Sequence, residues 1–323
     1  MPTPIVGLHH VTAIASNPQR NLDFYTQVLG LRFVKRTINF DDPGSYHFYF
    51  GDDAGSPGTI LTFFPWPGAT RGTPGVGETA ATAFSVPTGS LDFWEQRLLA
   101  LGIPAERSGE RFEEEVLTFA DPDGMRLEIV AHAGAAEANP SRFSPDIPTW
   151  HSIRGFFGVT LALAATGHTA QVLATMGFHK VAEAANRTRY SAPGTALGNH
   201  IDLVVPANLT YGRMGAGSVH HIAFRTTDDA AQLAWRDLLS AEGMSVTPVQ
   251  DRTYFHSIYF REPGGVLFEI ATDPPGFALD EPIETLGEGL KLPPWLEPKR
   301  ATVEKHLPTI ELHKVQENKG GAQ

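Results

Sequence analysis

Two pairs of adjacent histidines occur at similar places in this sequence. The segment LHHVTA contains His9 and His10, and the segment VHHIAF contains His220 and His221. Each pair stands at the start of a short β-branched and apolar run, which is typical of a strand. Imidazole is a common metal ligand and titrates near neutral pH. A histidine pair that recurs at the start of two strands therefore indicates chemistry.

Internal repeats indicate that the fold itself does not need these histidines. The segment GLHHVTAIAS aligns with GFFGVTLALA, so that Phe157 and Gly158 stand in place of the first pair. The segment HHIAFRT aligns with AATAFSV, so that Ala80 and Ala81 stand in place of the second pair. Because two of four repeats keep histidine, we infer that those two use it for a function.

A glutamate completes a candidate set of metal ligands. The segments DPDGMRLEIV and EPGGVLFEIA align Glu128 with Glu269. His10, His221 and Glu269 form a 2-His-1-carboxylate set, which suits Fe(II) and leaves coordination positions open for substrate and dioxygen. We expect His221 and Glu269 on neighbouring strands of one curved sheet, and His10 from a module packed face to face with it. Glu269 also reads as a relic of the repeat, because Glu128 shares its position.

The elements that must position these residues repeat four times along the chain. In the first repeat, HHVTAIA predicts a strand, and Asn17 with Pro18 predicts the start of a helix that ends at Gly30. The segments RFVKRTINF, SYHFYFG and TILTFFP then predict three more strands, separated by Asp, Pro and Gly turns. We therefore predict an α+β protein of four βαβββ modules that form two domains of curved mixed sheets.

Composition suggests where the chain divides. An Ala/Pro/Ser-rich stretch without periodicity predicts a linker. Trp295 is expected to pack a Pro-rich arm against the body, and the polar last 15 or so residues are expected to fray. The predicted units are 1–135 for an N-terminal domain with modules 1 and 2, 136–150 for the linker, 151–280 for a C-terminal domain with modules 3 and 4, and 281–323 for the arm and tail.

Bulk composition excludes several functional classes. The chain has 323 residues, of which 41% are hydrophobic and 19% charged, as in ordinary globular proteins. The formal net charge of −11 argues against nucleic acid or an anionic membrane as a partner. There is no cysteine, so thiolate ligands and thiol nucleophiles are excluded. No secretory signal or membrane-spanning run is evident, so we expect a cytoplasmic protein and leave open whether it is a homo-oligomer.

The repeats and motifs together resemble the vicinal oxygen chelate superfamily, which contains glyoxalases, bleomycin-resistance proteins and extradiol dioxygenases. More narrowly, LHHVT, GRMGAGSVHHIAF, DRTYFHSIYFREPGGVLFEIATDPPGF and LPPWLEPKR are similar to ring-cleaving dioxygenases that act on hydroquinones. The resemblance implies Fe(II), or alternatively Mn(II), bound by His10, His221 and Glu269. It also implies a hydroquinone-like or catechol-like small aromatic substrate, with O2 as the second reactant.

The resemblance further implies a set of catalytic residues around the substrate, namely His9, Thr12, His220, Arg252 and Tyr259. Strand alternation places Thr12 on the same face as His10. It places His9 and His220 on the opposite face, so that their roles depend on twist at the strand ends. Arg252 also reads as a surface residue, because another arginine occupies its matched position in the second repeat.

Two other functions stay open at this point. A glyoxalase-like isomerase or lyase would use four protein ligands, one from the late strand of each module. From Ala54 to Gly77 there is no Asp, Glu, His or Cys, so the fourth ligand is missing, which favours oxygen chemistry. A non-catalytic resistance protein that binds an aromatic compound would usually lack the metal triad. A second site built from Glu128 with His200 or Asp202 is disfavoured by the missing histidines.

Overall fold

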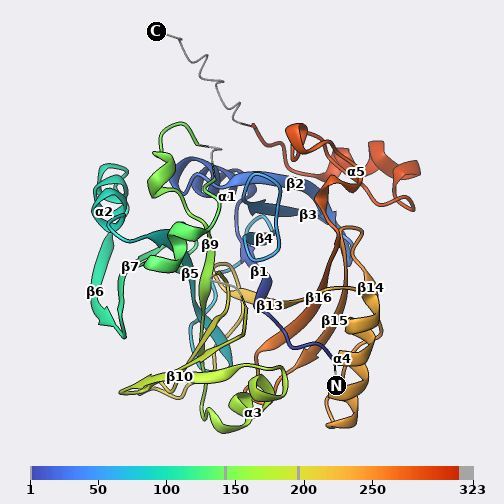
Figure 1. The fold of residues 1–323 in the computed structure, drawn as a ribbon. Helices are drawn as coiled ribbons and strands as arrows, with labels where there is room; N and C mark the ends of the chain where they lie inside the picture. The colour runs from blue at the N-terminus through green and yellow to red at the C-terminus, as the bar shows by residue number, and fades with distance from the viewer. Residues whose placement is uncertain (1, 142–143, 195–196, 313–323) are drawn as a thin grey trace.

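The chain folds into two curved eight-stranded sheets of mixed strand direction (Figure 1). This computed structural model describes residues 2–141, 144–194 and 197–312. A single cluster of buried apolar side chains includes residues from both sheets, with Trp94 and Trp235 among the largest. The predicted α+β class with four βαβββ modules is confirmed by this arrangement.

The first sheet takes its strands from the first and last modules, in the order β14-β15-β16-β13-β1-β4-β3-β2. Its strands are β1 (Leu8–Ala15), β2 (Arg32–Asn39), β3 (Asp42–Gly51), β4 (Ile60–Pro65), β13 (Val219–Thr226), β14 (Gln250–Asp251), β15 (Phe255–Arg261) and β16 (Leu267–Pro275).

The second sheet takes its strands from the two middle modules, in the order β10-β11-β12-β9-β5-β8-β7-β6. Its strands are β5 (Glu78–Pro87), β6 (Ala105–Arg111), β7 (Glu114–Ala120), β8 (Arg126–His132), β9 (Gly155–Ala162), β10 (His179–Ala184), β11 (Arg187–Ser191) and β12 (His200–Val204).

The first and fourth modules meet edge to edge, through antiparallel pairing of β1 with β13. The expectation that these modules pack face to face is therefore wrong, because hydrogen bonding between the two strands continues one sheet across both modules. Each sheet takes one module from each half of the chain. The predicted domains, residues 1–135 and 151–280, each contribute one module to each sheet. Their boundaries stay a prediction.

The helices lie close to their predicted positions. Asn17 caps the first one by accepting a hydrogen bond from the backbone N–H of Arg20 at 2.9 Å, and a π-helical turn over Phe24–Val28 continues it towards Gly30. The α-helices are α1 (Pro18–Asp23), α2 (Leu91–Ala100), α3 (Gly167–Thr175), α4 (Asp229–Ala241) and α5 (Arg300–His306). Short 3-10 turns span Ala133–Glu137, Thr149–His151, Phe277–Leu279, Ile283–Thr285 and Glu297–Lys299.

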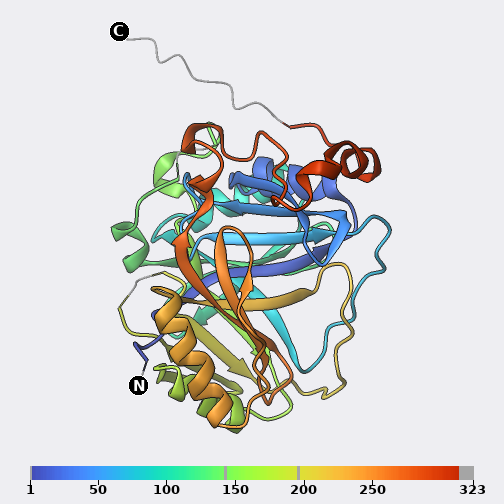
Figure 2. The ribbon, with the colours of Figure 1, turned by 90° about the vertical axis from the view of Figure 1, so that its right-hand side faces the viewer.

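In Figure 2, α4 lies as an orange helix beside the long β15 and β16 strands. No helix within the described residues combines the length and the apolar character needed to cross a membrane.

The C-terminal segment lies over the β2 and β3 end of the first sheet (Figure 1). Trp295 meets the ring of Phe40 edge-on, with centroids 5.5 Å apart, and stays 56% exposed. The arm was predicted to pack against the body through Trp295, and the ring contact that Trp295 makes there is with Phe40. The last 15 or so residues were predicted to fray. Of these, residues 313–323 lie outside the described part of the chain.

Candidate metal centre and substrate cavity

Strand register brings the predicted triad to one face of the first sheet. His10 of β1 pairs with Ala223 of β13, and Ala223 pairs in turn with Glu269 of β16. Thr12 pairs with His221. Directly opposed residues on neighbouring strands share a face, so all three predicted ligands point to the same side of the sheet. The small side chain of Ala223 leaves space between His10 and Glu269.

The three side chains converge on one point. His10 Nε2 lies 3.2 Å and His221 Nε2 lies 2.9 Å from Glu269 Oε2. The three candidate ligand atoms all lie within 4.8 Å of one another, and the residues are almost fully buried. Three electron-pair donors thus surround one small space inside the sheet.

The carboxylate of Glu269 has one satisfied and one unsatisfied oxygen. Oε1 accepts a hydrogen bond from Ser257 Oγ at 2.5 Å, whereas Oε2 is buried and has no hydrogen-bond donor among the described residues. Burial would raise the pKa of Glu269, but the facing His10 and His221 hold it well below its usual range. Burial lowers the pKa of His221. A buried anionic oxygen without a donor is costly unless a cation binds it, so this donor set fits a metal ion.

Each histidine pair is joined internally by its Nδ1 atoms. His9 Nδ1 lies 2.9 Å from His10 Nδ1, and His220 Nδ1 lies 2.8 Å from His221 Nδ1. Burial lowers the pKa of His9, with a smaller contribution from His10, and burial with His221 lowers the pKa of His220 to about 4. His9 and His220 are therefore neutral at pH 7. Their Nδ1 atoms can accept a hydrogen bond from Nδ1–H of His10 and His221. This contact leaves Nε2 of His10 and His221 directed at Glu269.

Breaks in strand register decide where the first histidines point. The pairing of β1 with β13 skips His9 between Leu8 and His10, and it skips His220 on the other strand. An unpaired residue of this kind redirects its side chain. Regular alternation placed His220 on the face opposite to His221, and that expectation is wrong, because both residues line one cavity.

A cavity of about 440 Å³ opens in front of the triad. His10, His221, His220, Arg252 and Tyr259 are among the residues that line it. Its walls also include the aromatic rings of Phe40, Phe64, Trp66 and Phe255. A mostly aromatic cavity of this size with a few polar groups suits a small ring compound.

Arg252 and Tyr259 form a polar pair in this cavity. Arg252 Nε donates to Tyr259 Oη at 3.2 Å, and Arg252 Nη2 lies 3.2 Å from Asp41 Oδ2. The Arg252 side chain is 19% exposed, which contradicts its reading as a surface residue. Burial, followed by Glu269, raises the pKa of Tyr259, so that its hydroxyl is a neutral hydrogen-bond donor.

His9 and Thr12 are absent from the described lining of the cavity. His9 is 2% exposed and contacts the ring of Phe255 at 5.1 Å between centroids. Thr12 Oγ1 accepts a hydrogen bond from Thr62 Oγ1 at 2.9 Å. Direct contact of either residue with substrate therefore stays a prediction.

Sequence reasoning missed two residues of β3 that line the cavity, His47 and Tyr49. His47 Nε2 lies 2.9 Å from Thr62 Oγ1, and His47 Nδ1 lies 2.9 Å from Tyr49 Oη. Tyr49 pairs with Thr62 as Tyr259 pairs with Glu269. Tyr49 is thus the repeat equivalent of Tyr259, and carrying the internal alignment one strand further would have found it.

The matched position in the second sheet is filled by a guanidinium group. Glu128 Oε2 and Oε1 accept hydrogen bonds from Arg111 Nη1 and Nη2 at 2.6 and 2.8 Å. A Cβ atom on Gly158 would lie 2.1 Å from the backbone oxygen of His200, so no histidine fits there. Asp202 is likewise paired with Arg189. These contacts agree with the expectation that Glu128, His200 and Asp202 form no second metal site.

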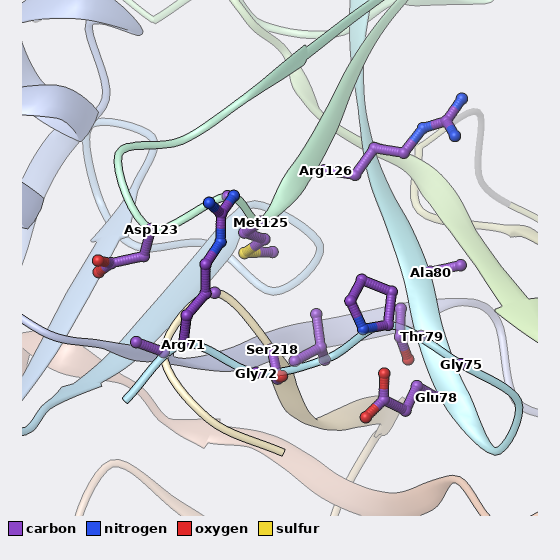
Figure 3. Close-up of a pocket in the computed structure, with 15 residues that line it drawn as sticks. Arg71, Gly72, Gly75, Glu78, Thr79, Ala80, Asp123, Met125, Arg126 and Ser218 are labelled. Carbon is purple, nitrogen blue, oxygen red and sulfur yellow. The ribbon is translucent and has the colours of Figure 1, made fainter. Parts of the chain in front are cut away.

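A second cavity of about 190 Å³ lies where two glycine-rich linkers meet (Figure 3). Isolated bridges join Arg71 to Ala216 and Thr73 to Arg213 across these linkers. Its buried carboxylate, Asp123, is already bound by Arg20 at 2.6 Å. None of the predicted site residues is among the described residues that line it, so the larger cavity remains the candidate site.

The family model described as Glyoxalase/Bleomycin resistance protein/Dioxygenase superfamily matches residues 7–129 and 154–270. The protein named "Putative ring-cleaving dioxygenase MhqO" of Bacillus subtilis (strain 168) is 48% identical over 314 residues, which cover 96% of this chain and 98% of that protein. Chlorohydroquinone/hydroquinone 1,2-dioxygenase of Sphingobium indicum is 33% identical over 306 residues, which cover 92% of this chain and 94% of that protein.

Solved structures agree with these sequence matches. A crystal structure of a "putative dioxygenase" from Bacillus subtilis superposes with a TM-score of 0.92 at 47% identity, covering 97% of this chain and 99% of that one. Glyoxalase I from Zea mays shares the fold, with a TM-score of 0.62 at 12% identity over 83% of this chain and 92% of that one. Paired βαβββ modules around a buried metal-type donor set define the class. The chain belongs to the glyoxalase/bleomycin resistance/dioxygenase superfamily, as its motifs suggested.

Proposed function

We propose that this protein is an Fe(II)-dependent, extradiol-type ring-cleaving dioxygenase that inserts both atoms of O2 into a hydroquinone-like or catechol-like aromatic. The observation that carries the proposal is the unsatisfied Oε2 of Glu269 between two imidazole Nε2 atoms, beside an aromatic-walled cavity. The names of the relatives support the same activity. The proposal includes a cytoplasmic location and leaves the oligomeric state open.

His10, His221 and Glu269 would hold the metal. Two imidazoles and one carboxylate suit Fe(II) and also accept Mn(II). When bound, the ion would lower the pKa of a phenolic oxygen and offer neighbouring positions to the phenolate and to dioxygen. In this arrangement His10 and His221 each donate an Nδ1 proton to the preceding histidine, which fixes the ring and frees Nε2 for the ion.

The remaining residues of the cavity would bind and orient the aromatic ring. His220 is neutral, lines the cavity and would accept the phenolic proton. Arg252 would stabilise a developing anionic oxygen, and Tyr259 would donate a hydrogen bond to the same region. The aromatic walls would exclude water from the reacting ring.

The glyoxalase-like isomerase is less well supported. Its fourth ligand would come from β4, at the position that matches Glu269. The structure has Thr62 there, and the Thr62 hydroxyl is already engaged by His47 and Thr12. A three-ligand site with open positions favours oxygen chemistry over a closed four-ligand site.

Oxygen uptake tests the proposed activity. Protein loaded anaerobically with Fe(II) should consume about one O2 per hydroquinone or catechol when air is admitted, as expected for insertion of both atoms. Metal-free protein should consume none. Zero uptake with both substrates, on protein with full iron occupancy, would contradict the proposal. Production of an isomer from a hemithioacetal without oxygen uptake would favour the isomerase.

A further inference from the structure

We propose that Asp41 makes the cavity selective for uncharged hydroquinones by excluding rings that carry a carboxylate. This inference rests on the proposed function, since it concerns which ring substrates that same cavity accepts. It starts from the placement of charge around the cavity mouth.

The described side chains that line the cavity include one fixed cation that a carboxylate could bind. Among the described lining residues, Arg252 is the only lysine or arginine. Its Nη2 atom lies 3.2 Å from Asp41 Oδ2, and its Nε donates to Tyr259 Oη at 3.2 Å. A substrate carboxylate that sought Arg252 would therefore meet a guanidinium group that is already paired with an acid.

The mouth also carries a second carboxylate. Asp42 lines the cavity next to Asp41 and accepts a hydrogen bond from Trp66 Nε1 at 3.0 Å. The backbone N–H of Asp41 donates to Asn39 Oδ1 at 2.9 Å, which fixes the turn between β2 and β3. Two adjacent negative groups at the entrance repel an anionic ring before it reaches Arg252.

The second sheet indicates what the pairing with Asp41 achieves. There Arg111, which matches Arg252, forms two hydrogen bonds with Glu128, the counterpart of Glu269. In the first sheet Arg252 is directed at the rim instead, towards Asp41 and Tyr259. Asp41 thus holds the Arg252 guanidinium group at the substrate end of the cavity. At the same time it neutralises the positive charge of that group.

The test compares a charged ligand with its uncharged analogue. We would titrate 2,5-dihydroxybenzoate and its methyl ester into anaerobic, Fe(II)-loaded, full-length protein and measure both dissociation constants by calorimetry. The acid should bind the wild type roughly tenfold more weakly than the ester, as like charges a few ångströms apart near a surface imply. Asp41→Asn should reduce that ratio by about fivefold or more, because it removes one repelling charge and frees Arg252.

A matched control separates local charge from net charge. Asp237→Asn, on α4, removes a carboxylate of similar exposure (72% against 73% for Asp41) far from the cavity lining, so it should leave the ratio unchanged. Equal binding of acid and ester by the wild type would overturn the proposal. So would an unchanged ratio in Asp41→Asn, or exclusion of both ligands, which would indicate steric selection.

Oxygen uptake with hydroquinone, measured on the same samples, reports on the proposed function separately. Uptake of oxygen with equal acid and ester binding would reject only the role of Asp41. Absence of uptake would reject the dioxygenase, whatever the ratio.

Discussion

At the scale of single residues, the site depends on how the two nitrogens of each imidazole are used. A metal ligand needs one nitrogen free and the other fixed by a hydrogen bond. In both pairs the fixing partner is the preceding histidine, at 2.9 Å for His9 and 2.8 Å for His220. In the proposed metal site, each pair would therefore act as one unit, made of a ligand and the residue that orients it. This explains why histidines recur together at two strand starts.

Removing one ligand should abolish metal retention without unfolding the chain. His221→Ala deletes one of the three candidate donor atoms, so iron should fall from about one per chain to near zero by elemental analysis. Wild-type protein should gain about 2.7 kcal/mol of unfolding free energy at a metal concentration of 100 times Kd, and the variant should gain almost none.

His256→Ala is the matched control, because His256 lies on the same sheet and bonds to Asp229 at 2.6 Å outside the cavity lining. It should keep wild-type iron content. Full iron occupancy in His221→Ala would mean that the ligand assignment is wrong.

At the scale of elements, the segment after β16 supports one wall of the cavity. Phe277 packs against Tyr49, a cavity residue, with ring centroids 5.1 Å apart, and against Tyr254 at 5.0 Å. Lys35 of β2 is fully buried and lies 2.6 Å from Asp280 and 2.7 Å from Glu281. A buried lysine thus ties the C-terminal segment to the first sheet.

Breaking this tie should destabilise the protein and loosen the cavity wall. Lys35→Met leaves the buried carboxylate of Glu281 without its cation, which should cost about 3 kcal/mol of unfolding free energy in urea denaturation. Hydrogen exchange over Phe277–Leu279 should become faster. Lys291→Met serves as control, because the Lys291 ammonium group donates to the backbone oxygen of Asp280 at the surface, and its loss should cost under about 1 kcal/mol. Equal costs for both variants would argue against a special role of Lys35.

At the scale of the whole molecule, one sheet contains the candidate metal site, and the other has the same framework without it. The second sheet contains histidines too, but they are paired for structure. His200 Nδ1 bonds to Ser191 Oγ at 2.6 Å, and His132 Nε2 bonds to Ser85 Oγ at 2.9 Å. Burial, followed by the charge of Arg189, lowers the pKa of both histidines to about 4.

These half-buried, neutral histidines predict that the fold is sensitive to acid. An unfolded histidine binds a proton below its ordinary pKa of 6.5, whereas folded His200 binds one only near pH 4. The unfolded state therefore holds more protons between these values, and stability falls as pH drops from about 6.5 to 4. In metal-free protein, the unfolding free energy should fall between pH 7 and pH 4.5. In His200→Gln this fall should be smaller than in wild type by roughly 1 to 2 kcal/mol, measured by urea denaturation at both pH values.

His168→Gln, at an exposed position of α3, should keep the wild-type pH profile. An identical loss of stability in His200→Gln and wild type would show that His200 does not contribute.

The repeats alone were enough to predict the module pattern and the candidate triad. Four repeats gave an internal comparison in which His10 and His221 stand out against Gly158 and Ala81, and aligned glutamates pointed to Glu269. Side-chain type and local periodicity are properties of short segments, so they can be recognised without knowing how the chain folds back.

Which modules share a sheet, and where the remaining residues point, became evident only in the folded chain. Edge pairing of β1 with β13 follows from contacts between distant segments, and no local pattern encodes it. The skipped position at His220 lets its side chain line the cavity beside His221, against regular alternation. Asp41 reaches Arg252 only because the turn between β2 and β3 meets the connection between β14 and β15 at the cavity. Long-range contact geometry therefore decided the substrate end of the site, because it depends on the whole fold.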